Sequence, residues 1–218
     1  MNPLLIRRRG MMQAQQGGLP YDAEVEYLEA NNPYQTLNVI DSTHIDTGIY
    51  PTPYTSLEIK YSMNDDQVQR RICGCYGDLV YIIYTNGTKR IANSFADNTN
   101  DARNLSVILT PNTIFDVLMN AADLKSYVNG TAKITRTLRP NNTANFTMKL
   151  FAATDNQYQA YGRIYYCKLW NTNGGVNTML RDFIPVRVGA VGYMYDQVSG
   201  QLFGNAGTGD FVLGPDII

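Results

Sequence analysis

The stretch that decides the fold lies in the last third of the chain. Residues 162–170 read GRIYYCKLW, residues 180–187 read LRDFIPVR, and residues 192–211 read GYMYDQVSGQLFGNAGTGDF. These are short aromatic and β-branched runs separated by Gly, Asn, Asp and Pro, which is typical of strands that end at tight turns. The stretch predicts a packed β-sandwich, and it holds none of the groupings that hydrolysis, redox or metal chemistry needs.

The overall composition agrees with one large β domain. The chain has 218 residues, 44% of them hydrophobic, so a substantial core is available. Only 17% of the residues are charged and the net charge is −1, which provides no long-range field for a nucleic acid. No apolar run approaches the length of a membrane span. We therefore expect neither a nucleic-acid partner nor a membrane-spanning segment.

Alternation of apolar and polar residues begins at about residue 24 and continues to the end of the chain. It predicts strands that include 25–29, 57–61, 78–84, 105–109, 146–152, 163–170, 180–186, 191–195 and 211–213. Asn86-Gly87, Asn129-Gly130 and Asn173-Gly174-Gly175 predict hairpin turns between neighbouring strands. The segment from Ile114 to Ala122 fits a helix and a strand equally well. Many short strands at this spacing indicate a sandwich or a barrel.

Residues 1–20 differ in composition from the rest of the chain. An apolar group followed by an arginine triplet, Leu4, Leu5, Ile6, Arg7, Arg8 and Arg9, precedes a segment rich in Gln, Met and Gly that ends at Pro20. One interpretation is a flexible terminal tail. The other is an arm that docks on a partner, with the apolar residues as an anchor and the guanidinium groups paired with carboxylates. The sequence leaves both open, and residues 21–218 form the domain.

A turn motif near the C-terminus carries a local prediction. In the segment 195–203, Asp196 is placed to accept turn amides and Gly200 to adopt a positive φ that reverses the chain. We expect Tyr193, Tyr195 and Phe203 to meet across the resulting hairpin. The glycines that follow at 204, 207 and 209 indicate a turn rather than a phosphate loop, because no Lys-Ser/Thr pair and no helix come after them.

These residues resemble a known group. The opening VEYLEA at 25–30 with HIDTGI at 44–49, and the ending described above, are similar to the two ends of concanavalin A-like, LamG-type jelly-roll domains. Such domains recur in structural proteins of phages and prophages, notably of gut Bacteroidetes. The resemblance covers about residues 24–216. It implies two apposed antiparallel sheets, a virion location after assembly in the bacterial cytoplasm, and other virion proteins as partners.

The rival from the enzyme class is a laminarinase-type glucanase of the same superfamily. Its motif of spaced carboxylates resembles the run EVEYLE, which places Glu24 and Glu29 at matching positions. On a regular strand these two side chains would point to opposite faces, so a bulge would be required. The run also lies on the first strand of the domain rather than on a central one. We expect no catalysis at these glutamates.

The sequence contains few residues that could ligate a metal or act as a nucleophile. His44 is the sole histidine, and we expect it to be a paired or surface residue. Cys73, Cys75 and Cys167 make an odd set, which predicts reduced thiols that serve as small core residues. Calcium is the open alternative to a chain without a cofactor, because Asp97, Asn98, Asn100 and Asp101 form a loop of oxygen ligands; Asp97 and Asp101 would be its carboxylates.

Glycan binding is consistent with the many aromatic residues, since sugar faces stack on rings while amides and carboxylates bond the hydroxyls. Tyr158 and Tyr161, together with Asn156, are the loop residues predicted to contact a sugar; packing between subunits is the alternative use of such tyrosines. Trp170 is predicted to end a strand and to lie in the core.

The sequence and the resemblance together predict a non-enzymatic phage virion protein, such as a head fibre, decoration or tail-associated protein. A lectin-like domain would be displayed outward, held by residues 1–20, and assembled as a homo-oligomer. A carbohydrate-binding module that recognises host surface glycans is the alternative function, and a glucanase-like enzyme is the third.

Overall fold

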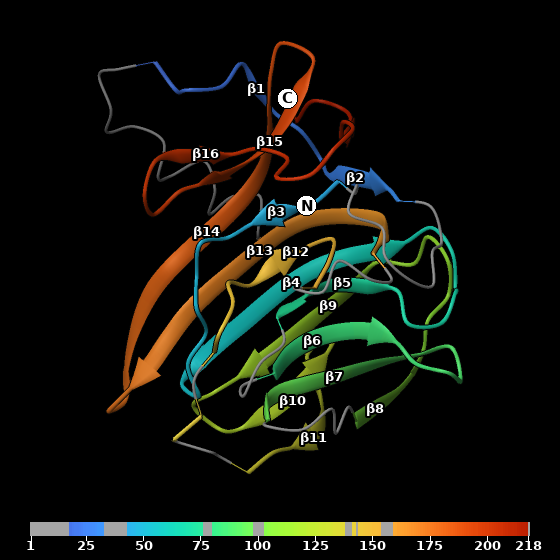
Figure 1. Cartoon of the computed structure of the whole chain (residues 1–218), viewed down its shortest axis with the longest axis vertical. Coiled ribbons are helices and arrows are strands. Elements are labelled where there is room, and N and C mark those ends of the chain that lie inside the picture. Colours follow the sequence, from blue (N-terminus) through green and yellow to red (C-terminus); the bar gives the residue numbers. More distant parts are fainter. Residues whose placement is uncertain are drawn as a thin grey trace.

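The computed structural model describes residues 18–32, 43–75, 80–97, 103–137, 141–142, 144–153 and 159–217. Within these residues all regular structure is β, arranged in two antiparallel sheets (Figure 1). The predicted all-β, two-sheet sandwich is confirmed. The arm residues Leu4 to Arg9 lie outside the described part of the chain. No helix in that part is long and apolar enough to cross a membrane.

The large sheet follows the order β11-β10-β9-β4-β13-β14-β15-β16, with β1, β2 and β17 attached to it. Its strands are β1 (Ala23–Glu24), β2 (Leu28–Asn31), β4 (Thr55–Met63), β9 (Phe115–Asn120), β10 (Lys125–Val128), β11 (Thr131–Thr135), β13 (Tyr161–Asn173), β14 (Val176–Val188), β15 (Val191–Asp196), β16 (Gln201–Phe203) and β17 (Val212–Leu213). The segment left open between helix and strand is therefore a strand, β9, whose residues alternate between buried and half-buried.

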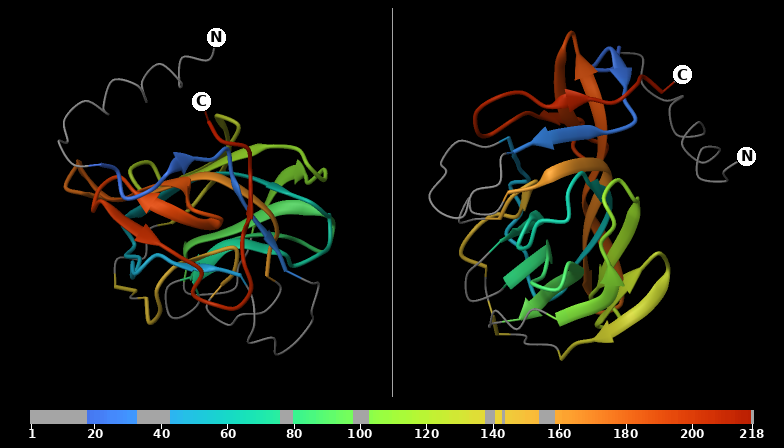
Figure 2. Two further views of the ribbon diagram at one scale, coloured as in Figure 1. Left: turned by 90° about the horizontal axis from the view of Figure 1, so that it is seen from above. Right: turned by 90° about the vertical axis from the view of Figure 1, so that its right-hand side faces the viewer.

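The small sheet follows the order β3-β12-β5-β6-β7-β8. Its strands are β3 (Ile45–Asp46), β5 (Arg71–Cys75), β6 (Val80–Thr85), β7 (Arg90–Asp97), β8 (Arg103–Ile108) and β12 (Lys149–Leu150). The two layers face each other in the right-hand view of Figure 2, and β1, β2, β15 and β16 lie together at one end of the sandwich.

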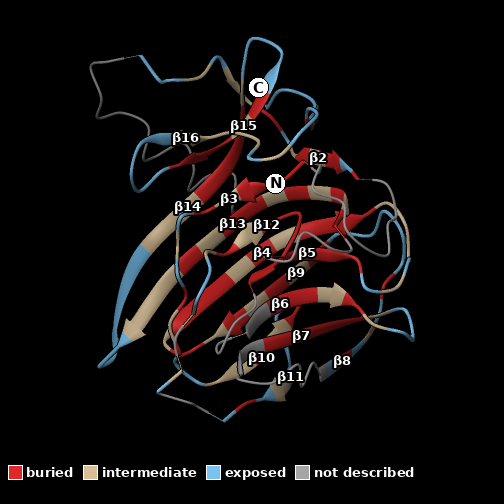
Figure 3. Cartoon of the chain, viewed as in Figure 1, coloured by how far each residue is buried: buried red, intermediate tan, exposed pale blue. Residues whose placement is uncertain are grey.

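The long strand β13 organises the large sheet. One of its edges pairs with β4 from Gly162 to Asn171. Its other edge pairs first with β2 and then, from Cys167 onward, with β14. The inward side chains of these strands, such as Leu57, Ile59 and Leu169, are fully buried and pack against the small sheet. Figure 3 shows the buried residues along the strands of both sheets in red.

The three cysteines lie in this core. Cys73, Cys75 and Cys167 are buried and reduced, as predicted. Burial raises the pKa of the Cys73 and Cys167 thiols. These cysteines therefore serve as small apolar residues rather than as nucleophiles.

The turns follow the sequence prediction closely. In the β10–β11 hairpin, Asn129 and Gly130 have φ of 50° and 75°, the pair of positive values that a tight two-residue turn needs. Asp196 is fully buried and accepts bonds from the amides of Asp182, Val198 and Ser199 at 2.8, 3.1 and 3.2 Å. These bonds fix the β15–β16 turn, where Gly200 has the predicted positive φ of 72°.

Two details of the strand prediction are wrong. Phe203 pairs with Met194 and packs edge-on against Phe183, whereas Tyr193 and Tyr195 contact Leu202 on the opposite face of the hairpin. The alternation of side chains along β16 separates Phe203 from the two tyrosines.

The first predicted strand is also divided in two. β1 pairs with β14 and β2 pairs with β13, because the chain changes partner strand at Val25, which bridges to Asp216. Glu24 and Glu29 therefore lie on different strands.

Close packing at Gly162 gives a test of the β13–β4 pairing. A Cβ at this position would lie 2.4 Å from the carbonyl oxygen of Ser62 and 3.1 Å from the Cα of Met63. Because both atoms are backbone, we expect Gly162→Ala to destabilise the protein by about 2–4 kcal/mol. Thermal unfolding should show a decrease in Tm of roughly 5–15 °C.

Gly87→Ala is the matched control for this substitution. A Cβ at Gly87 meets nothing within 4 Å, so its Tm should stay close to that of the wild type. Equal Tm values for the two variants would contradict the register of β4 against β13.

Candidate functional site

The outward side chains of the large sheet form the candidate site. Residues that alternate with the buried ones on β4, β9, β13 and β14 face away from the small sheet. We call five of them the outer-face cluster: Glu58, Asp116, Tyr166, Lys168 and Asp182. Trp170 lies on the same face, two residues after Lys168 on β13.

A backbone bulge in β13 positions the central member of the cluster. The register against β4 shifts between Ile164 and Tyr166, so that Tyr165 is the extra residue. The shift turns Tyr166 outward, while Cys167 and Leu169 after it remain in the core. Without the bulge, Tyr166 would point toward the small sheet.

Tyr166 connects two carboxyl groups on neighbouring strands. Its hydroxyl oxygen lies 2.9 Å from Oε1 of Glu58 and 2.7 Å from Oδ2 of Asp116. The ring is only 8% exposed. Burial, followed by the bond to Asp116, raises the pKa of the Tyr166 phenol, so the hydroxyl keeps its proton at neutral pH.

The Tyr166 hydroxyl can donate its single proton to only one of the two carboxyl oxygens. A hydrogen bond to the other oxygen therefore requires a proton on one of the two carboxyl groups, which donates it to the hydroxyl oxygen. Glu58 is the group that its surroundings favour for this proton. Burial, together with the nearby negative charge of Asp116, raises the pKa of Glu58, although the bond to Tyr166 opposes this shift. The phenol thus occupies the space between the two carboxyl groups.

Further along β13, Lys168 pairs with Asp182 of β14. Their nitrogen and oxygen atoms are 3.4 Å apart, and both side chains are partly exposed.

Trp170, one position further along this face, is half-buried rather than enclosed, and it stands opposite Met179, which is 42% exposed. The prediction that Trp170 ends a strand in the core is therefore wrong: β13 continues to Asn173, and the indole lies on the solvent-facing side.

At the other end of the same face, Arg163 packs over the ring of Tyr27 with 4.8 Å between the guanidinium carbon and the ring centre. Its Nε donates to Oε2 of Glu29 at 2.6 Å, and Asn64 donates to the other carboxylate oxygen at 2.8 Å. Tyr21 donates to Glu24 at 3.4 Å. The two glutamates of the glucanase-like run are thus on separate strands with separate partners.

The remaining sequence predictions fall in several places. Tyr161 begins β13 rather than lying in a loop, and its ring lies 5.9 Å from the guanidinium group of Arg70. Tyr158, Asn156 and Asp101 lie outside the described residues, and of Asp97 only the backbone, at the end of β7, is described. The sugar and calcium roles given to these residues stay predictions.

His44 is buried, and its amide donates to Oδ1 of Asn205 at 2.9 Å. Asn205 also accepts from the amide of Gly207 at 3.0 Å and donates to the carbonyl of Gly209 at 2.7 Å, which makes the glycine-rich segment a closed turn. Among the described residues, no three His, Cys, Asp or Glu side chains are placed to hold a metal ion.

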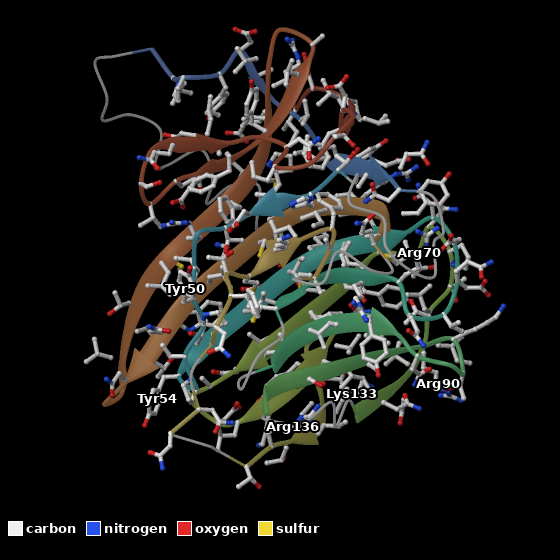
Figure 4. All side chains as sticks on the ribbon, viewed as in Figure 1. Tyr50, Tyr54, Arg70, Arg90, Lys133 and Arg136 are labelled. Carbon is white, nitrogen blue, oxygen red and sulfur yellow. The ribbon has the colours of Figure 1, made fainter. Side chains whose placement is uncertain are left out.

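An exposed aromatic pair lies beside this face, on the loop between β3 and β4. Tyr50 is 60% exposed and Tyr54 is half-buried. Figure 4 places both tyrosines at the margin of the sandwich along which β14 runs. The carbonyl of Tyr54 accepts from the amide of Thr172 at 2.8 Å, so the loop is joined to the end of β13.

Comparison with known proteins identifies the fold. No protein-family model and no curated protein matches the sequence. Among solved structures, the chain is similar to a candidate carbohydrate-binding protein from Bacteroides ovatus, with a TM-score of 0.59 and 9% identity over 90% of this chain. It spans 61% of that protein. It is also similar to the native heptameric SAP-like pentraxin of Limulus polyphemus, with a TM-score of 0.55 and 9% identity over 89% of this chain and 98% of the pentraxin.

Both structures have lectin-like jelly-roll folds, and the predicted jelly-roll architecture is confirmed. At this level of identity the similarity establishes the fold alone.

The raised pKa of Glu58 predicts a pH-dependent stability effect. In the unfolded chain Glu58 loses its proton near pH 4.3, whereas the folded protein holds it to higher pH. Stability is therefore lost as the pH rises above the unfolded pKa. We expect Glu58→Gln, which is neutral at every pH, to match the wild type in acid and to become the more stable protein as the pH rises toward 7.

Urea unfolding of both proteins at about pH 4 and pH 7 measures this difference. Glu26→Gln, at an exposed position, is the control and should show no such trend. A Glu58→Gln variant that loses stability relative to the wild type as the pH rises would contradict the assignment.

Proposed function

We propose that this chain is a non-catalytic, lectin-like domain that binds glycans on the outer face of its large sheet. The observation that carries the proposal is the half-buried indole of Trp170 next to the outer-face cluster, on one solvent-facing surface of β13. A sugar ring stacks its apolar side on an indole while its hydroxyl groups bond to nearby polar side chains.

The polar groups on this face are held in position before any ligand arrives. Tyr166 is fixed by Glu58 and Asp116, and Lys168 is paired with Asp182. All five belong to strands of one continuous sheet. Groups that are already ordered lose little conformational freedom when a ligand binds, which favours affinity for a weakly apolar ligand such as a sugar.

The same geometry argues for binding rather than hydrolysis. Glycoside hydrolysis needs one carboxyl group to donate a proton to the glycosidic oxygen and a second to act on the sugar from the other side. In this protein the Tyr166 hydroxyl lies between Glu58 and Asp116 and is bonded to both. A substrate would have to displace a buried phenol to reach the carboxyl groups.

The structural neighbours support this proposal, since the Bacteroides ovatus protein is itself a candidate carbohydrate-binding protein. The virion role rests on the sequence resemblance at residues 24–216 and on the composition of residues 1–20. On that basis the domain would serve as a receptor-binding module of a phage particle, with its outer face directed at host surface glycans.

Binding of the purified full chain to a glycan array tests the proposal. We expect the wild type to bind a defined set of glycans, and Trp170→Ala to lose at least about tenfold in affinity, since buried aromatic anchors contribute more than about 1.4 kcal/mol to binding. An unchanged circular dichroism spectrum would show that the variant is folded.

Tyr50→Ala is the matched comparison, because Tyr50 is an exposed aromatic residue on the neighbouring loop. If Tyr50→Ala abolishes binding and Trp170→Ala does not, the outer-face site is wrong although glycan binding stands. Absence of binding to any glycan, or release of sugar from β-glucans by the wild type, would overturn the function itself.

A further inference from the structure

One segment of the large sheet has an edge with no partner strand. One edge of β14 pairs with β13 as far as Phe183 and with β1 at Val186 and Arg187, and the other edge pairs with β15 from Phe183 onward. In the described part of the chain no strand pairs with that side between Val176 and Leu180. Figure 3 shows this part of β14 as an exposed strand at the margin of the molecule.

The other margins carry features that discourage pairing with a second chain. β11 contains Lys133, which Figure 4 places near the end of the large sheet, and its pairing with β10 has a register shift. β16 and β3 are short, with three and two residues. β8 has a register shift against β7 and a positive φ of 58° at Ser106.

The free edge of β14 is longer than β16 and β3, and its irregularity, a register shift against β13 that makes Leu180 the extra residue, lies at the end of the unpaired stretch. Its sequence, Val-Asn-Thr-Met-Leu at 176–180, contains no charge and no proline. Val176 and Met179 are 67% and 42% exposed. An uncharged edge with exposed apolar side chains is a form that pairs readily with another strand.

The backbone directions along this edge follow from the hairpin register. Gly174 and Gly175, with φ of 59° and 80°, form the tight turn, so Asn173 and Val176 are a hydrogen-bonded pair. Bonding residues alternate along the strand, and Thr178 therefore bonds to Asn171 of β13. The amide and carbonyl groups of Asn177 and Met179 point outward.

We propose that the free edge of β14 pairs antiparallel with the same edge of a second copy, about a two-fold axis that passes beside Thr178. This register opposes Asn177 of one copy to Met179 of the other, and both have outward backbone groups. About four main-chain hydrogen bonds result from the two symmetric pairs. Thr178 stands opposite Thr178 and Val176 opposite Leu180, which are favourable cross-strand pairs.

The length of the free edge also fits a second copy. The unpaired stretch of β14 begins directly after the turn at 174–175. At the other end Asp182 is already engaged, since its carbonyl accepts from the amide of Gln197 at 2.9 Å. Thr178 is the middle residue of the unpaired stretch 176–180. A second copy that pairs antiparallel about Thr178 therefore covers this stretch and ends where the pairing with β15 begins. A symmetric contact of this kind closes as a dimer.

Sedimentation equilibrium on the full chain tests the proposal without reference to any ligand. The interface is small, so we expect a weak dimer that becomes populated as the concentration rises to about 0.5 mM. Thr178→Lys should give a monomer, because two positive charges would face each other across the axis. Thr178→Asp should be monomeric for the same reason, and an equimolar mixture of the two variants should dimerise.

Thr131→Lys, at an exposed position on the opposite margin of the same sheet, is the matched control and should dimerise like the wild type. Three results would overturn the proposal: a wild type that stays monomeric at every concentration, an assembly that Thr178→Lys leaves intact, or a mixture of the two charged variants that stays monomeric. Each readout is a molecular mass and is independent of glycan binding.

Discussion

The structure depends on the pairing of β13 along both of its edges. Its thirteen residues form ladders with β4 on one side and with β2 and then β14 on the other. A strand held on both edges cannot slide by one residue without turning its buried side chains outward. This constraint fixes which residues of the chain's last third enter the core, and it requires the close approach of backbones at Gly162.

The same constraint determines which side chains of the large sheet face solvent on its outer side. Core residues and outward residues alternate, so Glu58 and Lys168 face outward because Ile59 and Leu169 are buried beside them. The bulge at Tyr165 modifies this alternation, and it adds Tyr166 to the outward set. A polar and aromatic surface is thus a consequence of core packing plus a single extra residue, and the rigidity of the core is transmitted to it.

The sequence predicted local features well and long-range ones poorly. The turns at Asn129-Gly130 and around Asp196 could be predicted because Gly, Asn and Asp favour turn conformations through their own local backbone and side-chain properties. The outer-face cluster was not readable, because Glu58, Asp116 and Tyr166 are far apart in the chain and meet only through the register of three strands. The alternation at 57–61 predicted the strand that carries Glu58, but nothing local indicated the neighbours of this side chain.

Trp170 shows a second limit of the sequence. A tryptophan at the end of an alternating run predicts core, since large aromatic residues are mostly buried. Which of the two faces carries the indole depends on the bulge in β13, and a bulge leaves no clear signal in a run such as RIYYCKLW. One extra residue therefore turns part of an expected core strand into surface, and this is where the candidate site lies.

Edge pairing of β14 has a consequence for recognition by the outer face. Asn177 and Met179 lie on the same face as Trp170, because Trp170 is opposite Met179 in the ladder. Two copies joined along this edge would form one continuous sheet with both indoles on one side, separated by three strand spacings, or about 15 Å. Two sites at that distance can engage neighbouring residues of one polymer or two adjacent chains on a surface. Individually weak sugar contacts would then add through the high local concentration of the second site, which a single copy cannot achieve.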